Sequence, residues 1–114
     1  MADWIEIYEE EQFDELVQQG PVIALFGASS DMAWNTVSSP IRAFVSAPMP
    51  LPPFVKVLYI DRDRLPQLAQ KRNVRIIPTA RFLHDGRQVS ELTGDQVTAE
   101  NIHRNFGKMM QTAQ

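Results

Sequence analysis

The spacing of apolar residues predicts three elements at the start of the chain. Residues 4–8 (WIEIY) alternate between apolar and polar side chains, which is typical of a half-buried strand. Residues 9–19 place apolar side chains on one face of a short helix, which Gly20 and Pro21 end. Residues 22–26 (VIALF) are apolar on both faces, as in a strand that helices cover on both sides.

The middle of the chain predicts a helix, a stiff connector and a second buried strand. Residues 34–46 carry apolar side chains at helical spacing, and Pro40 is expected to kink this helix. Residues 47–53 (APMPLPP) are proline-rich, which favours an extended connector. We interpret this connector as a rigid spacer, with a ligand for a proline-recognition module as the alternative. Residues 54–60 (FVKVLYI) predict the strand.

The last part of the chain contains clear turn and capping signals. Asp85-Gly86 between two strand-like runs is a strong hairpin signal, and Thr98 is a suitable N-cap for a final helix. The predicted elements are a helix opened by Pro66 and stopped by Asn73, strands at 79–84 and 88–93, and a helix from about Thr98 with Ile102, Phe106, Met109 and Met110 facing the core.

These elements follow the order β-α-β-α-β-α-β-β-α, which predicts an α/β fold with a mixed sheet and helices on both faces. The 114 residues contain no internal repeat and no composition change that would mark a boundary. We therefore expect one domain over residues 1–114.

Composition excludes several kinds of chemistry. The chain has no cysteine, so it has no disulfide, no thiol nucleophile and no thiolate metal site, and its two histidines are too separated to suggest a metal. We expect no cofactor. The beginning of the chain does not look like a signal peptide and no apolar run is long enough for a membrane span, so we expect a cytoplasmic protein without membrane contact.

Charge is distributed unevenly. Residues 1–20 carry seven of the 14 acidic residues and no basic one. We interpret this as a solvated acidic helix, with an acidic docking face as the alternative. No basic stripe is interleaved with aromatic residues, so a nucleic-acid partner is not expected.

The stretch from residue 59 to residue 94 contains a run of distinctive residues: Asp61 and Asp63, Pro66, Leu68-Ala69, Val74-Arg75-Ile76-Ile77-Pro78-Thr79 and Leu83-His84-Asp85-Gly86. In these residues, and in Pro40 and Gly94 at two further positions, the chain resembles the thioredoxin family. The resemblance extends over nearly the whole chain and implies the thioredoxin-like fold. It also implies a cis Ile77–Pro78 bond and an extended client segment bound by strand addition beside it.

The same resemblance shows what the chain lacks. The family's Trp-Cys-Gly-Pro-Cys falls on residues 30–34, which places Asp31 and Trp34 at the cysteine positions; counting back from Pro40 places Met32 and Asn35 there instead. The family's buried carboxylate falls on Leu25. Thiol–disulfide exchange needs a thiolate, so this chain cannot perform it.

The segment SSDMAW, residues 29–34, then needs another interpretation. Asp31, Ser29 or Ser30 is expected to cap the following helix, and a general acid–base role for Asp31 is the alternative. Trp34 either packs into the core or lies exposed with Met32 as an apolar patch that grips a peptide, and we leave both open. Arg81 interrupts an otherwise apolar strand. Such an arginine must find a carboxylate or reach solvent, and we expect it to extend under a helix toward solvent, with an anchor for an anionic ligand as the alternative.

We therefore expect a redox-inactive thioredoxin-like protein that acts in protein–protein interaction as a chaperone-like or scaffold subunit. Its partner would be a client protein or a partner subunit, and a homodimer is a further alternative. The expected binding residues are Ser29, Ser30, Asp31, Met32, Trp34, Ile76, Ile77, Pro78 and Thr79. The alternative function is an enzyme or a binder of a glutathione-like small ligand that uses Asp31, Trp34 and Arg81.

Overall fold

A computed structural model describes residues 2–112. The elements are β1 (Asp3–Glu6), α1 (Glu10–Leu16), β2 (Pro21–Gly27), α2 (Met32–Ser46), β3 (Lys56–Asp61), α3 (Pro66–Lys71), β4 (Thr79–His84), β5 (Arg87–Thr93), a short 3-10 turn (Gly94–Gln96) and α4 (Ala99–Thr112). The predicted order of strands and helices is confirmed.

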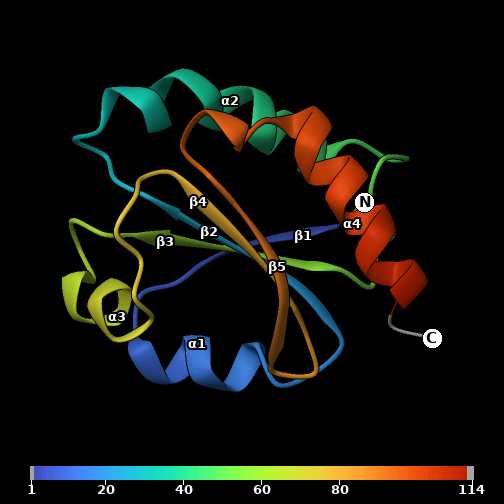
Figure 1. Cartoon of the computed structure of the whole chain (residues 1–114), viewed down its shortest axis with the longest axis horizontal. Coiled ribbons are helices and arrows are strands. Elements are labelled where there is room, and N and C mark those ends of the chain that lie inside the picture. Colours follow the sequence, from blue (N-terminus) through green and yellow to red (C-terminus); the bar gives the residue numbers. More distant parts are fainter. Residues whose placement is uncertain (1, 113–114) are drawn as a thin grey trace.

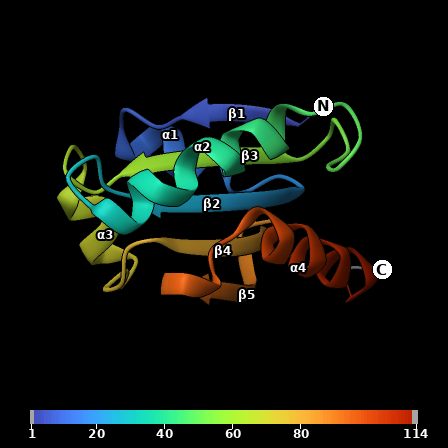
Figure 2. The same cartoon turned by 90° about the horizontal axis from the view of Figure 1, so that it is seen from above.

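One mixed sheet organises these elements, with strand order β1-β3-β2-β4-β5. Strands β1, β3 and β2 are parallel, whereas β4 is antiparallel to β2 and β5 is antiparallel to β4. Helices α2 and α4 lie on one face of the sheet and α1 and α3 lie on the other (Figure 1). Figure 2 shows the strands side by side in this order.

The core has two halves, one on each face of the sheet. Strand β2 is buried along its full length, as its two apolar faces predict, because successive side chains point to opposite layers. Leu25 belongs to the cluster under α2 and α4, whereas Phe26 belongs to the cluster against α1 and α3. In α4, Ile102, Phe106 and Met109 are buried, which confirms the predicted apolar face.

Turns and caps occur where the sequence predicts them. Asn73 ends α3 with φ 57°, and the hairpin residues Asp85 and Gly86 have φ 52° and 83°. Thr98 caps α4, since its hydroxyl accepts a hydrogen bond from the Asn101 amide at 3.1 Å. The Ile77–Pro78 peptide bond is cis, as the resemblance implies.

Several predicted boundaries were wrong. Helix α2 begins at Met32 rather than at residue 34, because Asp31 takes the cap position. The third strand begins at Lys56 rather than at residue 54, since Phe54 is exposed and Val55 is buried as part of the connector. The first strand and the first helix end at Glu6 and Leu16, earlier than their apolar patterns suggested.

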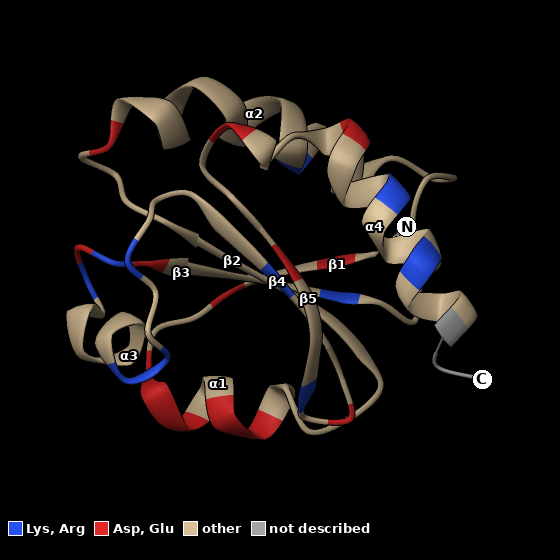
Figure 3. Cartoon of the chain, in the orientation of Figure 1, with Lys and Arg blue, Asp and Glu red and all other residues tan. Residues whose placement is uncertain are grey.

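Charged residues on α1 are partly neutralised by the neighbouring helix. Glu10 pairs with Lys71 at 2.6 Å, and Asp14 pairs with Arg72 at 2.9 Å. Figure 3 shows the acidic face of α1 beside basic positions around α3. The predicted picture of a wholly solvated acidic helix is therefore only partly correct.

Candidate functional site

The loop from β2 to α2 is held by hydrogen bonds to the loop after β3. The Ser29 amide donates to Asp61 Oδ1 at 3.3 Å, and the Ser30 amide donates to Asp63 Oδ2 at 2.9 Å. The Ser29 hydroxyl also donates to Asp63, at 3.2 Å. Hydrogen bonds from Ser30 foremost, then from Ser29 and the charge of Arg62, lower the pKa of Asp63. Through these hydrogen bonds, both serines therefore hold the loop between β2 and α2 against the loop after β3.

Asp31 is the N-cap of α2. Its Oδ1 accepts a hydrogen bond from the Trp34 amide at 2.9 Å, and its backbone is extended with φ −95° and ψ 123°. This geometry confirms the capping interpretation. The carboxylate lines none of the pockets described below, so the structure offers no support for the acid–base alternative.

Trp34 is buried, with 4% of its surface exposed, so the alternative of an exposed, peptide-gripping tryptophan was wrong. Its ring stacks on Tyr59 with centroids 5.1 Å apart, and Tyr59 stacks in turn on Trp4 at 5.9 Å. A Cβ at Gly27 would lie 2.5 Å from the Trp34 ring, so glycine is what allows the indole to lie against β2. Burial, followed by the charge of Asp61, raises the pKa of Tyr59 to about 12.

One side of Trp34 borders a cavity of about 240 Å³, which we call the tryptophan pocket. Its other lining residues come from β1, α2 and β3: Trp4, Glu6, Ser38, Ser39, Arg42 and Tyr59. The Arg42 guanidinium lies 5.3 Å from the centre of a Trp4 ring. The pocket thus combines an aromatic wall with hydroxyl and charged groups.

Arg81 is held by contacts within the fold. Its Nε donates to Glu91 at 3.1 Å across the β4–β5 pair, and its Nη2 donates to the Asn73 carbonyl at 3.2 Å. Its Nη1 donates to the Arg72 carbonyl. These carbonyls follow α3, where a cation is favourable. Arg81 therefore fastens the loop that leads to Pro78. Glu91 is the carboxylate partner that an arginine in this strand is expected to find, which confirms that part of the prediction.

A second hollow lies where cis-Pro78 meets the start of α2, and we call it the proline groove. It has a volume of about 310 Å³ and is lined by Ala33, Thr36, Val37, Pro78, Gly94 and Asp95. The lining of the proline groove is mostly apolar, and Asp95 is the charged residue in it. The turn after β5 is fixed here, because the Gly94 amide donates to the Pro78 carbonyl at 2.8 Å.

Two exposed apolar side chains belong to residues next to lining residues of the groove. Met32 precedes the lining residue Ala33 in α2 and is 83% exposed, and Ile76 is 52% exposed. A Cβ added at Gly94 would lie 3.8 Å from Ile76 Cγ2, so Ile76 lies beside this lining residue. Large apolar side chains at this exposure, grouped around a hollow, are typical of an interaction surface.

The predicted binding residues are thus divided among several roles. Pro78 lines the groove, Met32 and Ile76 lie next to lining residues, and Ile77 is partly buried between the two core clusters. Thr79 is buried and its hydroxyl donates to the Ile76 carbonyl at 2.6 Å. The sequence interpretation missed Ala33, Thr36 and Val37, although their i, i+3, i+4 spacing on one face of α2 could have indicated them.

The three residues of the alternative function do not form one site. Trp34 lines the tryptophan pocket, whereas Arg81 lines a separate hollow of about 100 Å³ between the 73–76 loop and β5. Within residues 2–112, no cluster of three or more His, Asp or Glu is arranged to hold a metal ion. No helix in that part of the chain is long and apolar enough to cross a bilayer.

Comparison with known proteins agrees with the fold. No protein-family model matches the sequence. Among solved structures, thioredoxin from Trypanosoma brucei brucei has a TM-score of 0.83 at 18% identity, with 96% of this chain and 93% of that chain covered.

Two further thioredoxins give similar values. A mutant thioredoxin of Halobacterium salinarum matches with a TM-score of 0.77 at 20% identity, over 93% of this chain and 89% of that one. Thioredoxin O2 of Arabidopsis thaliana, in its oxidised state, matches with 0.76 at 20% identity, over 95% of both chains. This chain therefore has the α/β fold of thioredoxins, and it contains no cysteine.

Proposed function

We propose that this protein works by protein–protein interaction, as a chaperone-like or scaffold subunit that holds an extended segment of a partner in the proline groove. The observation that carries the proposal is the groove itself. Pro78, Ala33 and Val37 line a hollow of about 310 Å³, and Ile76, which is 52% exposed, lies beside its lining residue Gly94. Burying such side chains against a partner is favourable by about 25 cal/mol for each Å² of apolar surface.

The arrangement around the groove suits an extended segment. In the 73–76 loop, the Asn73 and Val74 amides bond within the chain, so the backbone groups that could pair with an added strand are those around Arg75, while a side chain of the segment fills the hollow. Arg81 and Thr79 fasten this loop through its own carbonyls, at Asn73 and Ile76. A surface that is ordered before binding loses less conformational entropy on association.

Affinity capture with matched variants tests the proposal. Ile76→Asp and Ala33→Glu place a charge at exposed positions of the groove, whereas Met49→Glu changes an apolar side chain that is 86% exposed in the connector after α2. This connector lies at the other end of the sheet from the groove (Figure 1). We expect the wild type and Met49→Glu to retain the same partner, and both groove variants to lose it. Equal retention by all four proteins would contradict the proposal.

The tryptophan pocket supports a second candidate function, the binding of a small ligand. Trp34 is a buried wall of a cavity of about 240 Å³ that also presents Arg42 and the hydroxyls of Ser38 and Ser39. Such a mixture of aromatic and polar groups is typical of small-molecule sites. A screen by NMR, with glutathione among the compounds, would read the indole signals of Trp4 and Trp34. A compound that shifts both signals and not the groove amides would favour this function over the first.

A further inference from the structure

Basic residues cluster around α3, and most of them are already engaged. Lys71 and Arg72 pair with acidic residues of α1, at 2.6 Å and 2.9 Å. The Arg64 guanidinium lies 4.7 Å from the Tyr8 ring centre, in a cation–π contact. These three cations therefore stabilise the packing of α3 and its preceding loop against the first part of the chain.

Arg62 and Arg75 differ from these neighbours. Within the described part of the chain, neither guanidinium makes a hydrogen bond or an ion pair. Arg62 acts only through its charge, which contributes to the lowered pKa of Asp63 after the stronger effect of the Ser30 hydrogen bonds. Both arginines line the same cavity of about 440 Å³, which we call the arginine pocket.

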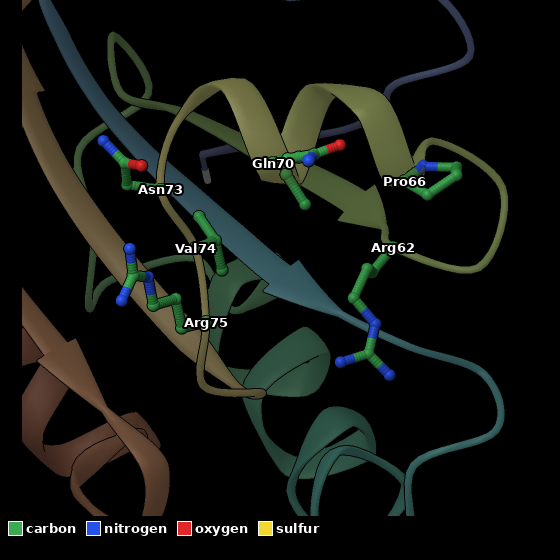
Figure 4. Close-up of a pocket in the computed structure, with 7 residues that line it drawn as sticks. Arg62, Pro66, Gln70, Asn73, Val74 and Arg75 are labelled. Atoms are coloured by element: carbon green, nitrogen blue, oxygen red, sulfur yellow. The ribbon is translucent and has the colours of Figure 1, made fainter.

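The shape of the arginine pocket limits what it can bind. Figure 4 shows Arg62 and Arg75 apart from each other, with Val74 beside Arg75 and with α3, which carries Gln70, running above both. Their guanidinium groups lie apart, so they do not converge on one small anion. Gln70 and Asn73 contribute side-chain amides to the lining of the arginine pocket, and Pro66 and Val74 contribute apolar surface. An extended ligand with more than one acidic group fits this pattern better than a single phosphate.

The chain itself connects the arginine pocket to the proline groove. Arg75 of the pocket is followed by Ile76, Ile77 and Pro78 of the groove, so three residue steps, which span at most about 10 Å, separate the two linings. The linings include residues of α3 and of the start of α2, and these helices follow the ends of β3 and β2 (Figure 1), where open parallel sheets bind ligands. A segment running along residues 75–78 would therefore reach Arg75 within about four residues of its groove-bound side chain.

We propose that the arginine pocket selects partner segments that carry acidic residues three to four positions from the apolar residue in the proline groove. This inference rests on the proposed function, since it names the charge of the segment bound there. Acidic side chains near these arginines already have other partners: Asp61 and Asp63 accept hydrogen bonds from Ser29 and Ser30, and Glu91 pairs with Arg81. The two arginines make no ion pair with them, and an acidic segment would supply one.

Designed peptides provide the test. The first probe is an eleven-residue peptide with a central leucine, glutamates three and four positions to each side, and serine or glycine elsewhere; the second has glutamine in place of every glutamate. Each is titrated into the ¹⁵N-labelled full chain at low salt, where exposed charge pairs are least screened. Backbone signals of residues 33–37 report the groove, and signals of residues 62 and 75 report the arginine pocket.

We expect the glutamate peptide to bind about 3- to 10-fold more tightly than the glutamine peptide, a range typical of a few exposed charge pairs. The preference should disappear in the double variant Arg62→Gln, Arg75→Gln. It should persist in Arg87→Gln, which removes an exposed arginine at the far end of β5. Equal binding of the two peptides to the wild type would overturn the inference, as would a preference that survives in the double variant.

The two proposals fail in different ways. If both peptides shift the groove signals with equal affinity, the proposed function stands and the acidic preference is refuted. If the glutamate peptide shifts only the signals of residues 62 and 75, the acidic preference stands and the groove is refuted as the binding site. If neither peptide shifts either set, both proposals are refuted for segments of this kind.

Discussion

Gly27 permits the buried position of Trp34, and the substitution Gly27→Ala tests this packing. The added methyl carbon would lie 2.5 Å from Trp34 Cδ2 and Cε2 and 2.8 Å from Cγ. These atoms belong to a rigid ring stacked on Tyr59, so the indole cannot bend away as a flexible side chain would. Either the helix or the ring must shift. Overpacking of this kind costs about 1–3 kcal/mol.

The opposing effect is smaller. Replacing glycine by alanine restricts the unfolded chain, which favours folding by about 0.4–1 kcal/mol where the backbone permits it. We therefore expect Gly27→Ala to lower the free energy of unfolding by about 1–2 kcal/mol. Urea unfolding followed by far-UV circular dichroism measures this change, and near-UV circular dichroism reports the altered stacking of Trp34.

Gly107→Ala is the matched control. Gly107 lies within α4, and a Cβ there meets no atom within 4 Å. Alanine should therefore stabilise the protein by about 0.5–1 kcal/mol, through its higher helix propensity. The same substitution, glycine to alanine, is thus expected to lower the free energy of unfolding at residue 27 and to raise it at residue 107.

A double-mutant cycle identifies the cause. In a Trp34→Leu background, the clash is removed and Gly27→Ala should cost little or become stabilising. The reasoning would be refuted if Gly27→Ala were neutral in the wild type. It would also be refuted if the substitution cost the same in both backgrounds.

Three further predictions concern the cap, the arginine and the tyrosine. Asp31→Ala removes the side-chain acceptor for the Trp34 amide, so it should destabilise the protein by about 1 kcal/mol in urea unfolding, whereas Asp31→Ser should retain most of the stability. Arg81→Leu leaves Glu91 and the Arg72 and Asn73 carbonyls without their donor, so it should destabilise by about 1–3 kcal/mol and speed amide exchange across residues 72–76; unchanged exchange there would contradict the fastening role. The pKa of Tyr59, raised to about 12, predicts a late tyrosinate absorbance in spectrophotometric titration, absent from Tyr59→Phe. Because this pKa is higher in the folded state, its stabilising effect is full below pH 10 and is lost as the pH rises toward about 12; a tyrosine titration complete near the ordinary pKa would disprove it.

Much of the fold could be predicted from signals within short stretches of the sequence. The two-sided apolar run that forms β2, the Asp85-Gly86 turn and the left-handed Asn73 each depend on neighbouring residues alone, so they are visible in the sequence. The apolar spacing placed the start of α2 two residues too late, because the helix begins directly after its N-cap Asp31 and its first residues do not face the core. The loop before this cap is held by hydrogen bonds to Asp61 and Asp63, which lie far along the sequence.

Properties of the site that depend on distant residues could not be predicted. Trp34 points into the core because Gly27 has no side chain to block its ring and because the ring can stack on Tyr59, which lies 25 residues further along the chain. The partners of Arg81 come from β5 and from the end of α3. An arginine within an apolar strand indicates that it needs partners, but the sequence does not indicate which residues provide them. The groove itself is formed only when α2 meets Pro78 and the turn at Gly94.

The central claim is that the proline groove contacts a partner protein, and site-specific photo-cross-linking in the native cell tests it most directly. A photo-reactive amino acid replaces Ala33 at the groove or, as the control, Met49, which is 86% exposed at the other end of the sheet. We expect one defined cross-linked partner from position 33, lost when Ile76→Asp is added, and none of that partner from position 49. The same cross-links from both positions, or a cross-link at position 33 that Ile76→Asp leaves unchanged, would contradict the claim.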